Sequence, residues 1–188
     1  MGLLSEARLI LSKYIIDVRP IVYKSEEKNT TWEKSNIRGW LNDKFYNSAF
    51  TEEEKSKIKE TLLVNEDNDD YMTLGGKDTT DKIFLLSIDE ARKYLSDGNS
   101  LENKDQLVRA GAAKGTQYAD YRRLGKIPEN KKDEYEEWML ENSAYYLRSP
   151  GGTQERTAAV RPNAIISTSG NDTGLNRRGV RPAMWIEY

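Results

Sequence analysis

The chain contains no cysteine and no histidine among its 188 residues. Without cysteine it can form no disulfide framework, no thiolate nucleophile and no thiolate metal site. Without histidine it lacks the usual acid–base group at neutral pH and the commonest ligand of transition metals. These two absences argue against zinc and non-haem iron sites of the usual kinds. Only oxygen-liganded cations such as calcium or magnesium stay open.

Long apolar runs and an excess of positive charge are also missing. No run approaches the roughly 18–20 apolar residues that span a bilayer. Glu6, Arg8 and Lys13 interrupt the apolar residues of Met1–Ile16, so we expect no signal peptide there. The formal net charge of −2 lacks the basic footprint of a nucleic-acid binder. We therefore expect neither a membrane span nor a nucleic-acid partner, while the compartment stays open.

The length and the aromatic content favour one globular domain. The chain is long enough for a real core, and its 4 Trp, 11 Tyr and 3 Phe residues supply bulky core material. The sequence contains no internal repeat and no linker. We therefore predict a single domain over residues 1–188.

Hydrophobic periodicity and turn residues predict helices in the first two thirds and a small antiparallel sheet in the last third. The first predicted helix begins at Thr30 or Thr31. Further helices are predicted from Thr51 to about Glu60, from Ser87 through Leu95, and over Gln117–Leu124 and Asp133–Asn142. The predicted strands are Leu9–Val18, Lys82–Ser87, Tyr145–Arg148, Ala158–Arg161, Ala164–Thr168 and Val180–Glu187. The remaining segments, including Asn65–Asp70 and Gly75–Thr80, are predicted loops. This order of elements indicates the α+β class.

Five segments, in order along the chain, carry a resemblance to a known family. They are W-x-x-S-x-I-R-x-W-L-N over Trp32–Asn42, KIFLLSIDEA over Lys82–Ala91, the set Arg109, Thr116, Tyr118 and Ala119, YYLRSPG from Tyr145, and GVRPAMWI from Gly179. From about Leu9 to Tyr188 they resemble an uncharacterised bacterial domain family. Its members show a "WWLRSPG" segment and a closing "GVRPALWI" strand.

That family is more distantly similar to the formylglycine-generating-enzyme and C-type-lectin-like folds. The resemblance implies a C-type-lectin-like domain, with two helices beside a small twisted antiparallel sheet and much loop. Tyr145 and Tyr146 depart from the family by standing where it shows two tryptophans. Family members also carry more strands before the position of Leu9. Either an N-terminal segment is missing here, or Met1–Ile16 closes the sheet alone.

The loop Ser169–Arg178 carries the sharpest functional hypothesis. It is polar, contains glycine and lies between two predicted strands, and binding residues often lie on loops that a rigid scaffold positions. The resemblance implies that this region faces the ligand, and some phage and bacterial proteins resembling this fold diversify it to change target. The candidate ligand-binding residues are Asn171, Asp172, Asn176, Arg177, Arg178 and the surface aromatic Trp138. The alternative is an ordinary connection between strands.

Other candidates favour a structural role. Arginines among apolar residues either bind anions or hold loop carbonyls, and tryptophans either stack on sugars or fill the core. We interpret six residues as structural, namely Trp32, Arg38, Trp40, Arg148, Arg181 and Trp185. The acidic segment Asn65–Asp70 has oxygen ligands that calcium prefers but lacks the EF-hand spacing, so a solvated turn is favoured and no cofactor is expected.

These observations leave several classes of function. The first is a non-catalytic module that binds a protein or a carbohydrate, by resemblance on a bacterial surface or a phage particle. The enzymes of the related folds depend on cysteine with copper or on histidine-bound iron, and this chain has neither residue. The alternatives are a structural or assembly domain of a larger protein and a carboxylate-based hydrolase, although no carboxylate pair stands out in the sequence.

Overall fold

The computed structural model describes residues 7–22, 30–96, 105–107, 111–125, 129–131, 142–173 and 178–187. Over these ranges the fold is α+β, with short helices and three sheets. None of the helices in these ranges is long and apolar enough to be a membrane span. The predicted α+β class is therefore confirmed.

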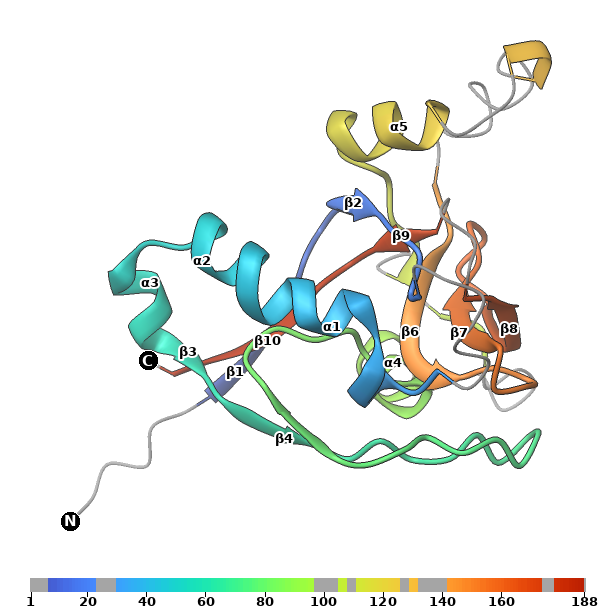
Figure 1. Ribbon diagram of the computed structural model, residues 1–188, viewed down its shortest axis with the longest axis horizontal. Coiled ribbons are helices and arrows are strands. Elements are labelled where there is room, and N and C mark those ends of the chain that lie inside the picture. Colours follow the sequence, from blue (N-terminus) through green and yellow to red (C-terminus); the bar gives the residue numbers. More distant parts are fainter. Residues whose placement is uncertain are drawn as a thin grey trace.

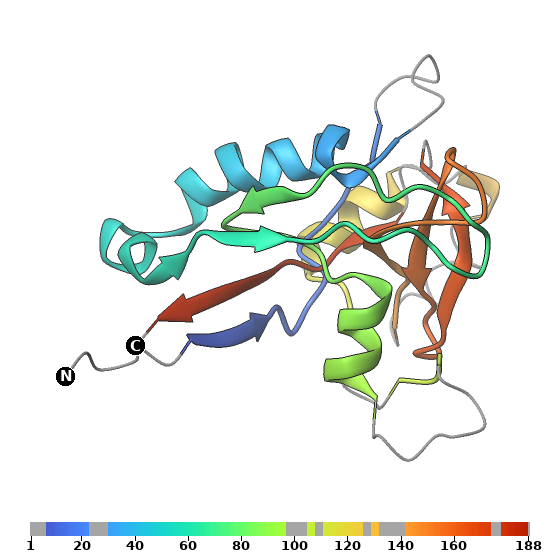
Figure 2. The ribbon, with the colours of Figure 1, turned by 90° about the horizontal axis from the view of Figure 1, so that it is seen from below.

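The first and last described strands pair with each other. Strands β1 (Ala7–Leu11) and β10 (Ala183–Glu187) run antiparallel, and β3 (Ile58–Lys59) pairs with the other edge of β10. Figure 1 places β1 and β10 at one side of the molecule and β6, β7 and β8 at the other, and Figure 2 shows β1 and β10 side by side. We call the side that carries β6, β7 and β8 the far pole.

The far pole is built on a five-stranded sheet. Its strands, in spatial order, are β2 (Asp17–Val18), β9 (Gly179–Val180), β6 (Tyr145–Pro150), β7 (Arg156–Val160) and β8 (Ile166–Asp172). All neighbours are antiparallel except β6 and β9. A two-stranded sheet of β4 (Thr61–Leu63) and β5 (Thr79–Asp81) stands apart from it.

The helices are short and lie before β6. They are the 3₁₀ turn Trp32–Lys34, α1 (Asn36–Trp40), the π-helical stretch Leu41–Phe45, α2 (Tyr46–Ala49), α3 (Glu52–Lys57), α4 (Ile88–Leu95), α5 (Gln117–Leu124) and the 3₁₀ turn Glu129–Lys131. A cluster of buried apolar residues contains members from Ile15 to Ala183. Phe84, Leu147 and Val180 are fully buried within it.

Two long predicted strands are each divided between two sheets. The prediction of Leu9–Val18 as one strand is wrong, because a bend in the chain separates β1 from β2. At this bend the Ser12 hydroxyl donates a hydrogen bond to the Tyr14 carbonyl. Val180–Glu187 is divided at Pro182, which has no N–H to continue a ladder. Besides the predicted strand region Leu9–Val18, the first third of the chain also contains β3 and β4, which the sequence did not predict as strands.

Several helix and strand bounds also differ from the prediction. The 3₁₀ turn Trp32–Lys34 begins after Thr31 as predicted, although without a side-chain cap, and the first α-helix is capped by Ser35. The helix predicted to reach Glu60 ends at Lys57, because Ile58–Lys59 pairs with β10. The predicted loop Gly75–Thr80 ends inside β5. Lys82–Ser87 is largely buried but forms only one bridge, from Phe84 to Ala183.

Locally encoded elements match the prediction more closely. Helix α4 begins after Ser87, whose capping box with Glu90 is complete, and α5 has the predicted bounds Gln117–Leu124. Strands β6, β7 and β8 lie at the predicted places, with bounds shifted by a few residues. The predicted helix Asp133–Asn142 lies almost entirely outside the described residues.

A buried carboxylate links the first helix to β5. The Asp81 side chain is 1% exposed. It accepts hydrogen bonds from Trp32 Nε1 at 2.9 Å, Arg38 Nε at 2.7 Å and Thr79 Oγ1 at 2.8 Å. One carboxylate thus satisfies an indole, a guanidinium and a hydroxyl.

Removing this carboxylate should destabilise the whole fold. Asp81→Ala leaves the Arg38 charge and two neutral donors without their acceptor, so we expect a loss of about 3–5 kcal/mol in the free energy of unfolding. Urea denaturation followed by tryptophan fluorescence measures it. The control Glu53→Ala removes an exposed ion pair with Lys57 and should change stability little. Equal effects of the two substitutions would contradict the assignment.

Candidate functional site

The long connection between β4 and β5, residues 64–78, forms an arm that lies against the far pole. Its Asn68 side chain is buried and donates from Nδ2 to the carbonyl oxygens of Pro150 and Thr168, both at 2.9 Å. Thr73 Oγ1 donates to the Gly151 carbonyl at 2.6 Å. In Figure 1 the arm runs beneath β6, β7 and β8. These bonds fix the arm to strands that are distant in sequence.

The tip of the arm, residues 66–74, is tightly folded. The backbone N–H of Asn68 donates to the Thr73 carbonyl, and the N–H of Met72 donates to the Asn68 carbonyl. Gln154 exchanges two hydrogen bonds with the backbone of Leu74. Met72 has a φ of +57°, a left-handed conformation that is uncommon for residues other than glycine. The backbone of the tip is therefore held in one shape.

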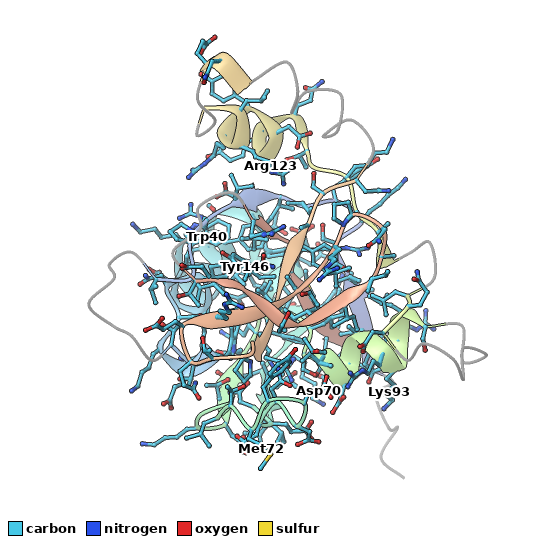
Figure 3. The ribbon with its side chains drawn as sticks, turned by 90° about the vertical axis from the view of Figure 1, so that its right-hand side faces the viewer. Trp40, Asp70, Met72, Lys93, Arg123 and Tyr146 are labelled. Carbon is cyan, nitrogen blue, oxygen red and sulfur yellow. The ribbon has the colours of Figure 1, made fainter. Side chains whose placement is uncertain are left out.

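Apolar side chains point outward from this fixed tip. Met72 is 85% exposed, Leu74 62% and Tyr71 45%. Figure 3 looks at the far pole and shows Met72 pointing away from the body of the molecule, with Asp70 nearby. These apolar residues directly follow Asn65–Asp70, the segment predicted as a solvated acidic turn, whose residues Glu66, Asp67, Asp69 and Asp70 are indeed exposed.

A small cleft of about 70 Å³ opens beside the tip. It lies between the arm, the start of α4 and the strands β6 and β8. Its lining consists of Glu66, Asp67, Asn68, Asp69, Asp70, Ser87, Ile88, Asp89, Arg92, Ser149 and Thr168. Carboxylates therefore dominate its walls. Even so, within the described ranges no group of three or more acidic side chains is arranged to hold a metal ion.

Two carboxyl groups at this cleft influence each other. The pKa of Glu66 is raised above its ordinary value of 4.5, mainly because its side chain shares a hydrogen bond with Asp89 and also because of partial burial. The Asp89 charge raises it further, whereas Arg148 lowers it. Asp89 also contacts Arg92 Nη1 at 3.2 Å. The pair is open to solvent, since the Asp89 side chain is 65% exposed.

The predicted ligand-binding loop is only partly a loop. Strand β8 extends through Asn171 and Asp172, and Arg178 immediately precedes β9. Arg178 Nη2 donates to Asn171 Oδ1 at 2.6 Å, so the structure brings these two candidates together. Asn176 and Arg177 lie outside the described residues, as does Trp138. Whether these side chains bind a ligand stays a prediction.

The three arginines interpreted as structural lie in separate places, so they form no common cluster. Arg38 pairs with Asp81. Arg148 pairs with Glu90 and donates to backbone carbonyls of neighbouring segments. Arg181 donates to the carbonyls of Ser12 and Gly111 and to the Tyr145 hydroxyl. Each guanidinium thus holds an irregular part of the chain in place.

The described tryptophans offer little surface for stacking. Trp32 is 2% exposed. Trp40 and Trp185 pack against the core while remaining partly exposed, which is less burial than the sequence predicted. The guanidinium of Arg19 lies 4.0 Å from the Trp40 ring centroid and covers that face.

No sequence pattern indicated the arm tip as a candidate site. Its apolar residues Tyr71, Met72 and Leu74 follow an acidic run and have no helical or strand period. The useful signal would have been three large apolar side chains in a segment without a core-facing pattern. The anchoring role of Asn68 depends on partners 82 to 100 residues away and has no local signature.

A comparison with protein families gives one match. A family model described as "Domain of unknown function (DUF6273)" matches residues 5–188. No curated protein and no solved structure matches the chain.

The carboxyl pair should make stability depend on pH. Because the pKa of Glu66 is raised in the folded state, folding favours the protonated form of this side chain. The stability that Glu66 contributes is therefore present at acid pH and is lost as the pH rises through the pKa of the folded state. Glu66→Gln should therefore raise the urea midpoint at neutral pH and change it little at acid pH. The control Glu60→Gln lies outside the cleft. An equal shift at both pH values would refute the coupling.

Proposed function

The chain belongs to the DUF6273 domain family, and from its geometry we propose a non-catalytic binding module, C-type-lectin-like in fold, that docks onto a protein through the arm tip. Short helices beside small antiparallel sheets, with long connections at the far pole, support the lectin-like part of this proposal. The resemblance of its motifs supports a place on a bacterial surface or a phage particle.

The rigid, apolar arm tip is the observation that carries the proposal. Asn68, Thr73 and Gln154 anchor its backbone, while Met72 and Leu74 remain exposed. A surface that is already ordered loses little conformational entropy on binding. Methionine also adapts its shape to a partner's pocket. Few residues usually carry most of the binding energy of a protein interface, and these two have the required exposure and support.

Charge around the tip defines the partner. Glu66, Asp67, Asp69 and Asp70 directly precede the apolar residues of the tip and line the cleft beside it, and Asp89 adds a carboxylate from α4. A partner with an apolar pocket and a rim of lysine or arginine would be complementary to this surface. We therefore favour a basic protein surface as the occupant.

The alternatives fit the described surface less well. In the ranges that the structure describes, each tryptophan is buried, packed on the core or covered by a guanidinium, so a carbohydrate ligand would find open aromatic rings only on tyrosines such as Tyr118 and Tyr121. A hydrolase would enclose its substrate, whereas the cleft with Glu66 and Asp89 has about 70 Å³ and binding pockets typically have about 300–1,000 Å³.

Substitution at the tip tests the proposal with a library of displayed random peptides as the probe. Wild-type protein should enrich peptides that combine lysine or arginine with large aliphatic residues. Met72→Asp with Leu74→Asp should weaken binding of the selected peptides by about tenfold or more. The control Tyr118→Asp with Tyr121→Asp changes two exposed tyrosines of α5 and should leave binding intact.

Three outcomes would contradict this proposal. They are failure to enrich any such peptide, equal binding by the tip variant, and a wild-type dimer in analytical ultracentrifugation that the tip variant abolishes. The last outcome would identify the surface as a contact between copies of this chain.

A substitution at the anchor tests whether the fixed backbone matters. Asn68→Ala removes the buried amide that holds the tip, at an expected cost of about 1–3 kcal/mol in stability. Amide hydrogen exchange in residues 66–74 should become faster, and peptide binding should weaken although no exposed side chain of the tip has changed. The control Asn47→Ala removes an exposed amide of α2. Unchanged exchange in the tip would mean that Asn68 does not order it.

A further inference from the structure

The register of the five-stranded sheet places two arginines on either side of one alanine. Tyr145 of β6 lies opposite Val160 of β7 and Gly179 of β9. Continuing this register one residue beyond the strand ends aligns Ala144, just before β6, with Arg161 after β7 and Arg178 before β9. The Gly179 N–H, which donates to the Ala144 carbonyl at 3.0 Å, fixes this alignment. Residues on one rung of a sheet share a face, so both arginines leave the sheet on the face of Ala144.

Among the described residues, these guanidiniums donate to neutral groups. Arg161 Nη2 donates to Ser167 Oγ at 3.4 Å, and Arg178 Nη2 donates to Asn171 Oδ1 at 2.6 Å. Among the described residues neither guanidinium forms an ion pair with a carboxylate, in contrast to Arg38 and Arg148. A guanidinium offers five N–H donors, so each retains donors for a ligand.

The two charges act on each other. Burial lowers the pKa of the Arg178 guanidinium, and the nearby charge of Arg161 lowers it further, whereas Tyr146 raises it. Arg123 of α5 is 5% exposed, and burial lowers the pKa of its guanidinium. The charge of Asp120 raises this pKa, whereas the charge of Arg178 lowers it further. Positive charge that is partly removed from water is stabilised most effectively by a negatively charged partner.

We propose that Arg161 and Arg178 form a binding site for an oxyanion, with the Ser167 hydroxyl as a further donor. The ligand class comprises phosphate, sulfate and carboxylate groups, which guanidinium binds through paired N–H donors. The Asn171 side chain orients Arg178 through its carbonyl oxygen and belongs to the same site. This site contains no residue of the arm tip, and the proposal does not depend on the proposed protein docking.

Titration with simple anions tests this site. Sodium phosphate, sulfate and acetate are added at constant ionic strength, and the arginine Nε–Hε resonances are followed by NMR. We expect saturable shifts of the Arg161 and Arg178 resonances. Arg161→Gln and Arg178→Gln should each weaken binding by about tenfold or more, as expected when a charged hydrogen-bond donor is lost. Arg156→Gln, an exposed position on β7, is the matched control.

The pattern of anions identifies the ligand group. Saturation by phosphate or sulfate alone indicates a tetrahedral oxyanion, and saturation by acetate indicates a carboxylate. Arg161 is exposed, so Arg161→Gln keeps the test valid if Arg178→Gln fails to fold. The site is refuted if none of the anions gives saturable shifts, or if the Arg156→Gln control loses as much affinity as the two site variants. The Met72→Asp, Leu74→Asp variant should bind these anions normally, so the two proposals fail independently.

Discussion

One guanidinium holds the parts of the far pole together. The Arg148 side chain is 4% exposed and pairs with the Glu90 carboxylate of α4. It also donates to the Leu85 carbonyl, to Asn65 Oδ1 and to the Val64 carbonyl. A planar fork of donors can serve several acceptors at once, and an ammonium group could not replace it. Strand β6, helix α4 and the base of the arm therefore share one buried charge, and the cleft and the arm tip are positioned by it.

Local signals in the sequence were sufficient for some elements and insufficient for others. Helix α4 follows from Ser87 and Glu90, because a capping box involves only neighbouring residues. Strand β3 ends a helical pattern at Ile58, because pairing with β10 stabilises these residues more than an additional helical turn would. The sequence predicted one strand over Val180–Glu187 despite Pro182, because the division of that strand between two sheets depends on the distant partners of each half.

The candidate surfaces likewise depend partly on local sequence signals and partly on contacts between distant segments. The sequence identified Asn171 and Arg178 as polar residues near a strand end, and the structure brings them into contact. It did not identify Arg161, because its alignment with Arg178 across Ala144 arises only from strand register. The far pole thus presents an acidic, apolar tip and a separate cationic face, which are suited to ligands of opposite charge.

The pairing of β1 with β10 has a mechanical consequence. Ala7 lies opposite Glu187, and Leu11 lies opposite Ala183, so both strands have their outer ends at the same place. Tension applied between residues 7 and 187 would peel this ladder apart one residue pair at a time, rather than shear all its hydrogen bonds together. The five-stranded sheet would not bear the load until the peeling had passed Leu11. A pull on the two ends of the described chain would therefore first separate β1 from β10, while the strands of the five-stranded sheet stay in register.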